Sequence, residues 1–403
     1  MKVKVLKFLD IAVEYLIYGV IFFIPISITM VGTFAGMATV FFLIKTILSK
    51  DLTAIKSNKI LFLFLLLFFI FMGLSLFNSG PFFAKSLKAL LIKWGRFPLL
   101  LWAIIDTFQD TRRIVKAACV FLFSATLVGL TVFTQKFFGF EFLRGRASWG
   151  YSAASIGPFE NPNNLAAYLT GVIPIVLSFG FGYKKRLMPK LCFLLITVVL
   201  ILSSFWARSR GGWLGLVLGL TLIILLISHH RVKKWFGIIC VTVVFFFIPA
   251  ITAVIYFYKH GKDVWRSLLI YGAWDMIKTN PFFGKGVGTF MDYSSLYTKN
   301  FAAGYAHNCY LQMWAESGIF SLLCFLLLAG YVFYRSIRTS LKISVSLNFF
   351  LLIGLTGGLL GFLVHSFFEV HLYSFQLSFL FWVVLGLTVA LSSNLDHESN
   401  FKS

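Results

Sequence analysis

Four side chains combine a chemically useful type with a position at the edge of an apolar run. Arg208 and Arg210 lie in the motif WARSRGGWLG, and Arg266 and His307 lie in the longest mostly polar stretch, residues 258–318. The guanidinium of arginine stays charged and binds phosphate oxygens through two parallel N–H donors. Two glycines follow Arg210, so a ligand or another backbone can approach it closely. We therefore expect Arg210 to suit a diphosphate.

Each of these side chains also has a structural interpretation. Arg208 could snorkel to the lipid headgroups along its apolar stem, and Arg266 could be a charge on a surface helix. A lone histidine is more often structural than catalytic, but His307 stands beside Asn308 where the polar stretch meets the next apolar run. Glu316, in that same run, could be a cap or a partner for an arginine.

A further set of ionisable residues lies inside or at the end of apolar runs. Lys93 and Arg96 fall within the fourth run, where a charge is costly and faces a cavity or a partner. Either could hold a lipid-linked anion or form a structural ion pair. His365 and Glu369 are four residues apart, which predicts a shared helix face, and His371 follows. That spacing could hold a metal ion, but we favour hydrogen bonding or a substrate contact.

The composition sets the class of protein that must position these residues. The chain has 403 residues, of which 59% are hydrophobic and 12% are charged, whereas soluble domains carry about 25% charge. It has 36 Lys and Arg against 14 Asp and Glu, a net charge of +22. The basic residues cluster between apolar runs, so membrane orientation explains them better than nucleic-acid binding. The five cysteines show no CxxC spacing, so neither a zinc site nor a disulfide framework is indicated.

The apolar runs predict an all-α polytopic membrane protein, since about 20 apolar residues cross a bilayer as a helix. About twelve spans are expected, and the break between the first two is placed around Gly32. The expected spans are residues 10–29, 32–49, 59–77, 86–108, 114–135, 164–182, 188–206, 211–228, 235–257, 309–334, 346–368 and 373–392. The basic N-terminus lacks a small-residue cleavage site after its first run, so that run is read as a retained span.

The connections between spans predict the orientation. Every second connection carries a basic cluster, which by the positive-inside rule places both termini in the cytoplasm. Residues 1–403 then form one integral membrane domain with two long extracytoplasmic loops. The loop 136–163 ends in an Asn-Pro turn that starts the sixth span. The loop 258–308, between the ninth and tenth spans, contains an amphipathic helix capped by Asp263 and ended by a Pro and Gly run.

Several motifs, taken in order, resemble the O-antigen ligase / O-antigen polymerase superfamily. They are GPFENPNNLAAY at 157–168, SRGG at 209–212, the block from Trp265 to Phe290 that ends NPFFGKGVGTF, and HNCYLQMWAESG at 307–318. The resemblance implies a GT-C-like helical glycosyltransferase of the bacterial inner membrane, with its active site facing the periplasm. Relatives take a glycan from undecaprenyl diphosphate and pass it to an acceptor, without a nucleotide sugar or a metal ion.

By motif match, the resemblance implies that Arg210 and Arg266, with Arg208 nearby, bind the donor diphosphate, while His307 acts at the acceptor hydroxyl. Secondary candidates are Lys93, Arg96, Asn308, Glu316, His365 and Glu369. The implied partners are the undecaprenyl-diphosphate-linked glycan, lipid A–core or another glycan acceptor, and membrane lipids; no nucleic acid and no cofactor are expected.

Three alternatives stay open at this point. A polymerase of the same superfamily would use a second lipid-linked repeat as acceptor, and we prefer ligation to lipid A–core. A transporter of lipid-linked sugars or small anions would fit twelve spans with charges inside the membrane. A structural or assembly subunit would need none of the outward arginines. The chain lacks the paired carboxylates of a glycoside hydrolase.

Overall fold

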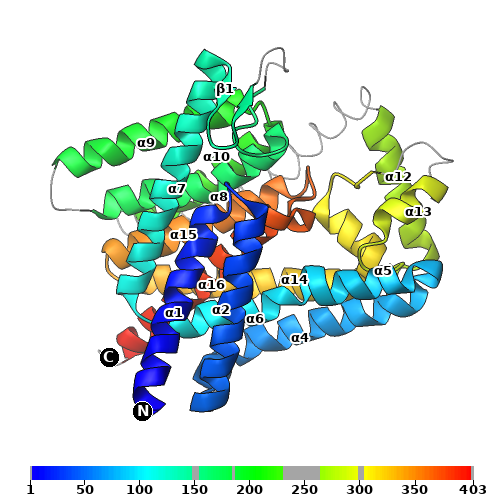
Figure 1. The fold of residues 1–403 in the computed structure, drawn as a ribbon, viewed down its shortest axis with the longest axis horizontal. Coiled ribbons are helices and arrows are strands. Elements are labelled where there is room, and N and C mark those ends of the chain that lie inside the picture. The colour runs from blue at the N-terminus through cyan, green and yellow to red at the C-terminus, as the bar shows by residue number, and fades with distance from the viewer. Residues whose placement is uncertain (1, 148–153, 184–186, 230–263, 298–303, 401–403) are drawn as a thin grey trace.

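The computed structural model describes residues 2–147, 154–183, 187–229, 264–297 and 304–400. Its chain is almost entirely helical (Figure 1). The helices are α1 (Lys2–Phe23), α2 (Ile28–Ser49), α3 (Thr53–Ser57), α4 (Lys59–Leu74), η1 (Ser75–Asn78), η2 (Gly80–Phe82), α5 (Phe83–Lys88), η3 (Ala89–Trp94), α6 (Arg96–Thr107), α7 (Thr111–Phe138), α8 (Pro162–Gly182), α9 (Leu187–Trp206), α10 (Arg210–His229), α12 (Val264–Thr279), α13 (Phe290–Tyr297), α14 (Cys309–Lys342), α15 (Leu347–His365), η4 (His371–Tyr373) and α16 (Phe375–Asn400).

Eight helices in the described part of the chain are long and apolar enough to cross a membrane. They are α2, α4 with η1, α7, α8, α10, α14, α15 and α16. The protein is therefore a multi-pass helical membrane protein. The count of twelve stays a prediction. The expected spans 10–29, 86–108 and 188–206 are not among these eight, and the expected ninth span, residues 235–257, lies outside the described residues. The predicted cap Asp263 lies outside them as well, but α12 confirms the helix that was expected to follow it.

The first two spans separate at residues 24–27, so the break placed around Gly32 is wrong. α1 ends at Phe23, just before Pro25, whose ring cannot continue a helix and which lacks an N–H donor. Ser27 then caps α2 by accepting a hydrogen bond from the Met30 N–H at 3.3 Å. Gly32 lies inside α2, where it leaves the helix intact.

The fourth expected span, residues 86–108, is not one regular helix. α5 passes into a π-helical turn, η3, before α6 begins. The Gly95 N–H donates to the Leu90 carbonyl at 2.8 Å, which is the i to i+5 bond of a π-turn. Such turns occur often at functional sites, and this one carries Lys93.

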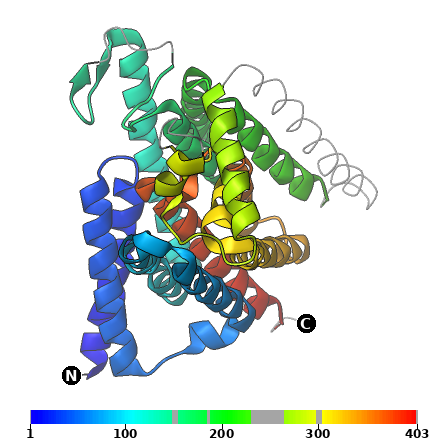
Figure 2. The same cartoon turned by 90° about the vertical axis from the view of Figure 1, so that its right-hand side faces the viewer.

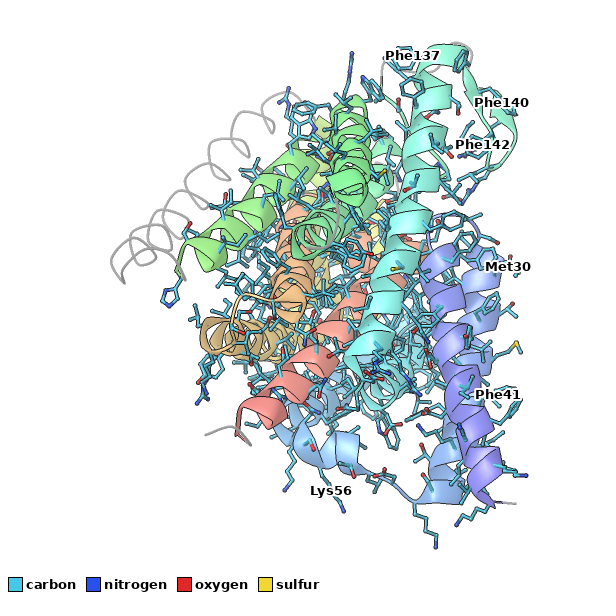
Figure 3. All side chains as sticks on the ribbon, turned by 90° about the vertical axis from the view of Figure 1, so that its left-hand side faces the viewer. Met30, Phe41, Lys56, Phe137, Phe140 and Phe142 are labelled. Atoms are coloured by element: carbon cyan, nitrogen blue, oxygen red, sulfur yellow. The ribbon has the colours of Figure 1, made fainter. Side chains whose placement is uncertain are left out.

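The loop 136–163 departs slightly from the all-α expectation. After α7, strands β1 (Phe140–Glu141) and β2 (Arg146–Ala147) form a short antiparallel hairpin. The Asn-Pro turn starts α8 as predicted, because the Asn161 side chain accepts from the Asn164 N–H at 2.8 Å. Figure 3 shows Phe137, Phe140 and Phe142 at the hairpin end of α7 and Lys56 at the opposite end of the molecule.

Glycines bring α8, α10 and α15 into close contact. An added Cβ at Gly215 would lie 2.4 Å from the Gly361 carbonyl oxygen, and one at Gly358 would lie 2.2 Å from the Gly171 carbonyl oxygen. Small residues allow helices in a membrane to approach at backbone distance, where dispersion contacts hold them together. This packing fixes the start of α10 beside the end of α15.

The remaining polar elements gather at one end of α14. In Figure 1, α12 and α13 lie together there, beside α5, and Figure 2 shows the same pair facing the viewer. Lys85 of α5 pairs with Asp292 of α13 at 2.6 Å, and the Tyr293 hydroxyl donates to the Ser79 carbonyl at 2.9 Å. Elements from the first and last thirds of the chain therefore enclose the same region.

Candidate functional site

Glu369 is the centre of a polar cluster drawn from three distant parts of the chain. Its Oε1 accepts hydrogen bonds from the Arg266 guanidinium of α12 and from the Asn163 amide of α8, the latter at 2.6 Å. Its Oε2 lies 2.9 Å from Nδ1 of His307, in the loop before α14. Because Arg266 also donates to the Phe368 carbonyl at 3.3 Å, the guanidinium is held at two points.

His307 is placed in an unusual backbone conformation. Its φ of 50° lies in the left-handed region, which non-glycine residues seldom adopt and which costs about 1–3 kcal/mol where it occurs. Asn308 follows as the N-cap of α14 and accepts from the N–H groups of Tyr310 and Leu311 at 2.9 and 3.0 Å. The cap and the Glu369 contact together compensate for the strain, and the ring is turned toward the cluster.

The hydrogen-bond chemistry of the cluster assigns the histidine tautomer. An ionised carboxylate only accepts, so the contact to Glu369 requires a hydrogen on Nδ1 of His307. Arg266 Nη2, 3.1 Å from the same nitrogen, then directs its donors to Glu369 and Phe368 instead. This leaves the lone pair of His307 on Nε2, so that nitrogen can accept a proton.

The charge state of Glu369 supports this assignment. Burial would raise the pKa of the Glu369 carboxyl, but the hydrogen bond with His307 and the positive charge of Arg266 more than offset it, so the pKa lies below its usual value. The side chains of Arg266 and Glu369 are 12% and 11% exposed, against 34% for His307. The ion pair is therefore sheltered, while the imidazole can be reached from outside.

Arg210 and Arg208 stand at the start of α10, one contact away from the cluster. Both side chains are exposed, and Arg208 has a left-handed φ of 52°. The neighbouring Gly211 packs so closely on Phe368 that an added Cβ would lie 2.8 Å from its side chain. Phe368 in turn accepts the hydrogen bond from Arg266. The SRGG motif is thus packed against Phe368, next to the ion pair of Arg266 and Glu369.

His365 and Glu369 do not share a helix face, so that prediction is wrong. α15 ends at His365, and Glu369 lies in the turn beyond it. The structure brings His365 instead to Ser209, at 3.1 Å from Nε2 to Oγ, and to His371, whose ring centre is 4.2 Å away. Burial lowers the pKa of His371 well below its usual value, so this ring stays neutral behind Glu369.

Glu316 holds the Gly-rich loop against α14. Its two oxygens accept from the N–H groups of Gly288 and Phe290 at 2.8 and 3.1 Å, and Gln312 donates at 3.2 Å. Gly284 has a φ of 69°, and an added Cβ there would lie 2.4 Å from the Glu316 carbonyl. The loop therefore needs glycine for its close approach to the helix.

Lys93 and Arg96 diverge in the structure. The Arg96 Nε donates to the Ile92 carbonyl at 2.7 Å, and its guanidinium lies 4.7 Å from the ring centre of Phe375. Lys93 lies over the ring of Tyr373 at 5.2 Å and lines a cavity together with Glu316.

A cavity of about 580 Å³ opens beside the cluster. Its lining includes His307, Glu369 and His371, together with Glu160 just before α8 and Asn164 in its first turn. Carboxylate, amide and imidazole groups on a concave surface suit a hydroxyl-rich ligand, because each can exchange hydrogen bonds with sugar hydroxyls.

Reasoning from the sequence missed Asn163, Tyr305 and Tyr373 as site residues. Asn163 lies in the NPNN run, where consecutive amides at the mouth of a span were a usable signal. Tyr305 and Tyr373 carry no comparable signal, because single tyrosines are common at membrane interfaces. Only the fold shows that both line the cavity.

The fold and the cluster define a class: a multi-pass helical membrane protein with an Arg–Glu–His site built from separate helices and their connections. Residues 195–326 match the family model described as O-Antigen ligase. This part of the chain is similar to the O-antigen ligase family, whose members are glycosyltransferase-like enzymes. The match includes Arg210, Arg266, His307 and Glu316, and it confirms the resemblance seen in the motifs.

A relative in Haemophilus influenzae is similar over more of the chain. It is 23% identical over 329 residues, which cover 70% of this chain and 74% of the relative, and it is described as an uncharacterized protein. The similarity therefore extends well beyond residues 195–326, but it assigns no activity to this chain.

Proposed function

We propose that the protein transfers a glycan from undecaprenyl diphosphate to an acceptor hydroxyl at the outer face of the bacterial inner membrane. The observation that carries the proposal is the Arg266–Glu369–His307 cluster beside a polar cavity. Within the reactions of the O-antigen ligase family, we propose ligation of O-antigen to lipid A–core.

The reaction is a displacement at the anomeric carbon of the donor. The acceptor oxygen forms a bond to that carbon, the bond from the carbon to the diphosphate oxygen breaks, and its electron pair leaves with undecaprenyl diphosphate. Negative charge grows on the diphosphate, where Arg210 and Arg266 would stabilise it. Their guanidinium groups supply this charge without any need for proton transfer.

His307 would take the proton of the acceptor hydroxyl on Nε2. The Nδ1–H contact to Glu369, at 2.9 Å, orients the ring and stabilises the imidazolium that forms. Glu369 is already ionised because of Arg266 and His307, so it stays a carboxylate through the step. His307 therefore works as a base that the Glu369 carboxylate orients, and no second carboxylate is required.

Single substitutions in a strain lacking the chromosomal gene test this function. Arg210→Ala, Arg266→Ala and His307→Ala should each abolish attachment of the glycan to lipid A–core, seen as loss of the high-mass lipopolysaccharide ladder on gels. Asp275→Asn, on the exposed face of α12, is the matched control and should attach normally. Normal ladders from all three variants would rule out the mechanism. Retained attachment of shortened glycans would indicate a polymerase.

A further inference from the structure

A second cavity, of about 390 Å³, adjoins the one beside His307. Its lining includes Lys85 and Lys88 of α5, Lys93 of η3 and Glu316 of α14. Three residues line both cavities: Met291, Tyr305 and Tyr373. The two cavities therefore share a wall, and a ligand in one can extend toward the other.

The π-helical turn places the three lysines on one side. Residues five apart, such as Lys88 and Lys93, lie about 140° apart around a regular α-helix and so face different ways. The i to i+5 bond between Gly95 and Leu90 widens the turn and brings residues of that spacing closer to one face. Without it, the Lys93 ammonium would point away from Lys88.

The charges of this lysine cavity do not cancel. Lys85 pairs with Asp292 at 2.6 Å. The oxygens of Glu316 already accept from the N–H groups of Gly288 and Phe290 and from Gln312. Lys88 forms no ion pair within the described residues. Lys85 and Asp292 cancel each other, so the ammonium groups of Lys88 and Lys93 share one carboxylate, Glu316, which leaves one excess positive charge.

Lys93 lies over an aromatic ring rather than in a close ion pair. Its Nζ lies 5.2 Å from the ring centre of Tyr373, and a cation over an aromatic face gains electrostatic attraction while its N–H donors stay available. Lysine differs from arginine in presenting a compact charge with three donors of free orientation. A carboxylate or a phosphate monoester can therefore bind in several poses, as suits the varied end of a glycan.

We infer that the lysine cavity binds an anionic group, a phosphate or a carboxylate, on the acceptor glycan. The inference rests on the proposed function, in which Arg210 and Arg266 hold the donor diphosphate and His307 meets the acceptor hydroxyl. The acceptor must enter opposite the leaving group, and the shared wall of Tyr305 and Tyr373 leads from the lysines to the His307 cavity. Binding the acidic group in the lysine cavity would select which acceptor hydroxyl reacts, because only a hydroxyl at a fixed distance from that group would reach His307.

Two arms of one experiment test the subsite on the full-length protein in nanodiscs. In the first, an amine-reactive reagent labels the lysines, and mass spectrometry follows Lys88 and Lys93 with Lys278, 73% exposed on α12, as the control. Glucose 6-phosphate should slow labelling of the cavity lysines about threefold or more, whereas glucose should not. Equal labelling with both sugars would overturn the inference, as would protection by phosphatidylglycerol nanodiscs but not by the sugar phosphate.

The second arm uses transfer kinetics to separate this inference from the function itself. The double variant Lys88→Gln/Lys93→Gln should raise the acceptor KM about tenfold and leave the donor KM and kcat within about twofold. The single variant Lys93→Arg, which keeps the charge, should have an acceptor KM close to that of the wild type. Lys278→Gln should match the wild type. An unchanged acceptor KM would refute the subsite while the function stands. If the wild type transfers nothing, the function fails and the labelling arm alone decides the subsite.

Discussion

Replacing Glu369 by glutamine separates the charge of the site from its shape. The carboxylate accepts from Arg266, Asn163 and the Nδ1–H of His307. In Glu369→Gln one oxygen becomes an NH₂ group. If the remaining carbonyl stays with the arginine, the new donor faces Nδ1 of His307. That nitrogen must then accept, so the ring hydrogen moves to Nε2, where the acceptor proton was to go.

The size of the effect follows from the work that the histidine does. A positioned general base contributes about 10²–10⁴-fold in rate, and the wrong tautomer removes most of it. We therefore expect kcat to fall by about 10²-fold or more, or about 2.7 kcal/mol of transition-state stabilisation at 1.36 kcal/mol per decade. The donor KM should change less, because Arg210 and Arg266 keep their charges.

A mutant cycle decides whether the two residues act as one unit. Rates of glycan transfer are measured with purified wild type, Glu369→Gln, His307→Gln and the double variant, with Asp275→Asn as control. When two residues act as one unit, replacing both lowers the rate little more than replacing one of them. Losses that multiply in the double variant, or a Glu369→Gln rate within about twofold of the wild type, would refute the reasoning.

Three further predictions concern binding, folding and pH. Arg266→Lys keeps the charge but loses the second donor, so kcat/KM for the donor should fall about tenfold in transfer assays. Gly318→Ala should lower yield and Tm sharply, since φ is 82° and the new Cβ would meet a backbone carbonyl at 2.0 Å, whereas Gly330→Ala, with open space, should not. Tm should fall on acidification from about pH 7.5 to 5, because the unfolded chain accepts a proton on His371 below about pH 6.5, whereas burial keeps the pKa of that ring well below its usual value in the folded protein. The pKa of Glu369 is lowered from an ordinary value of 4.5, so its stabilising charge is lost only below this window. A Tm that does not change with pH, or a pH dependence of Tm that is the same in His371→Gln, would contradict the pH prediction.

Local signals in the sequence predicted the elements well. Apolar length located most spans within a few residues, since the bilayer sets that length. Asn161 before Pro162 and Asn308 before Cys309 marked the starts of α8 and α14, because both side chains cap free N–H groups. Pro25 and Ser27 were equally good signals for the break between α1 and α2, and Gly32 was a weaker one.

The site was only partly predictable, because its contacts are long-range. Arg266 and His307 were expected from the motifs, but their bonds to Glu369 span 103 and 62 residues, and Asn163 joins from 206 residues away. The expected helix through His365 and Glu369 led away from this arrangement, because a helix would have placed the Glu369 carboxylate on the same face as His365. The π-turn that aligns the lysines has no local sequence signal.

The central claim is that this protein itself moves the glycan, and one reaction tests it directly. Purified protein in detergent is mixed with a radiolabelled glycan on undecaprenyl diphosphate and with lipid A–core, with no membrane separating two compartments. The account predicts labelled lipid A–core and an equal amount of free undecaprenyl diphosphate from the wild type, and neither from His307→Ala. No labelled product from active wild-type preparations, or equal product from both proteins, would contradict it.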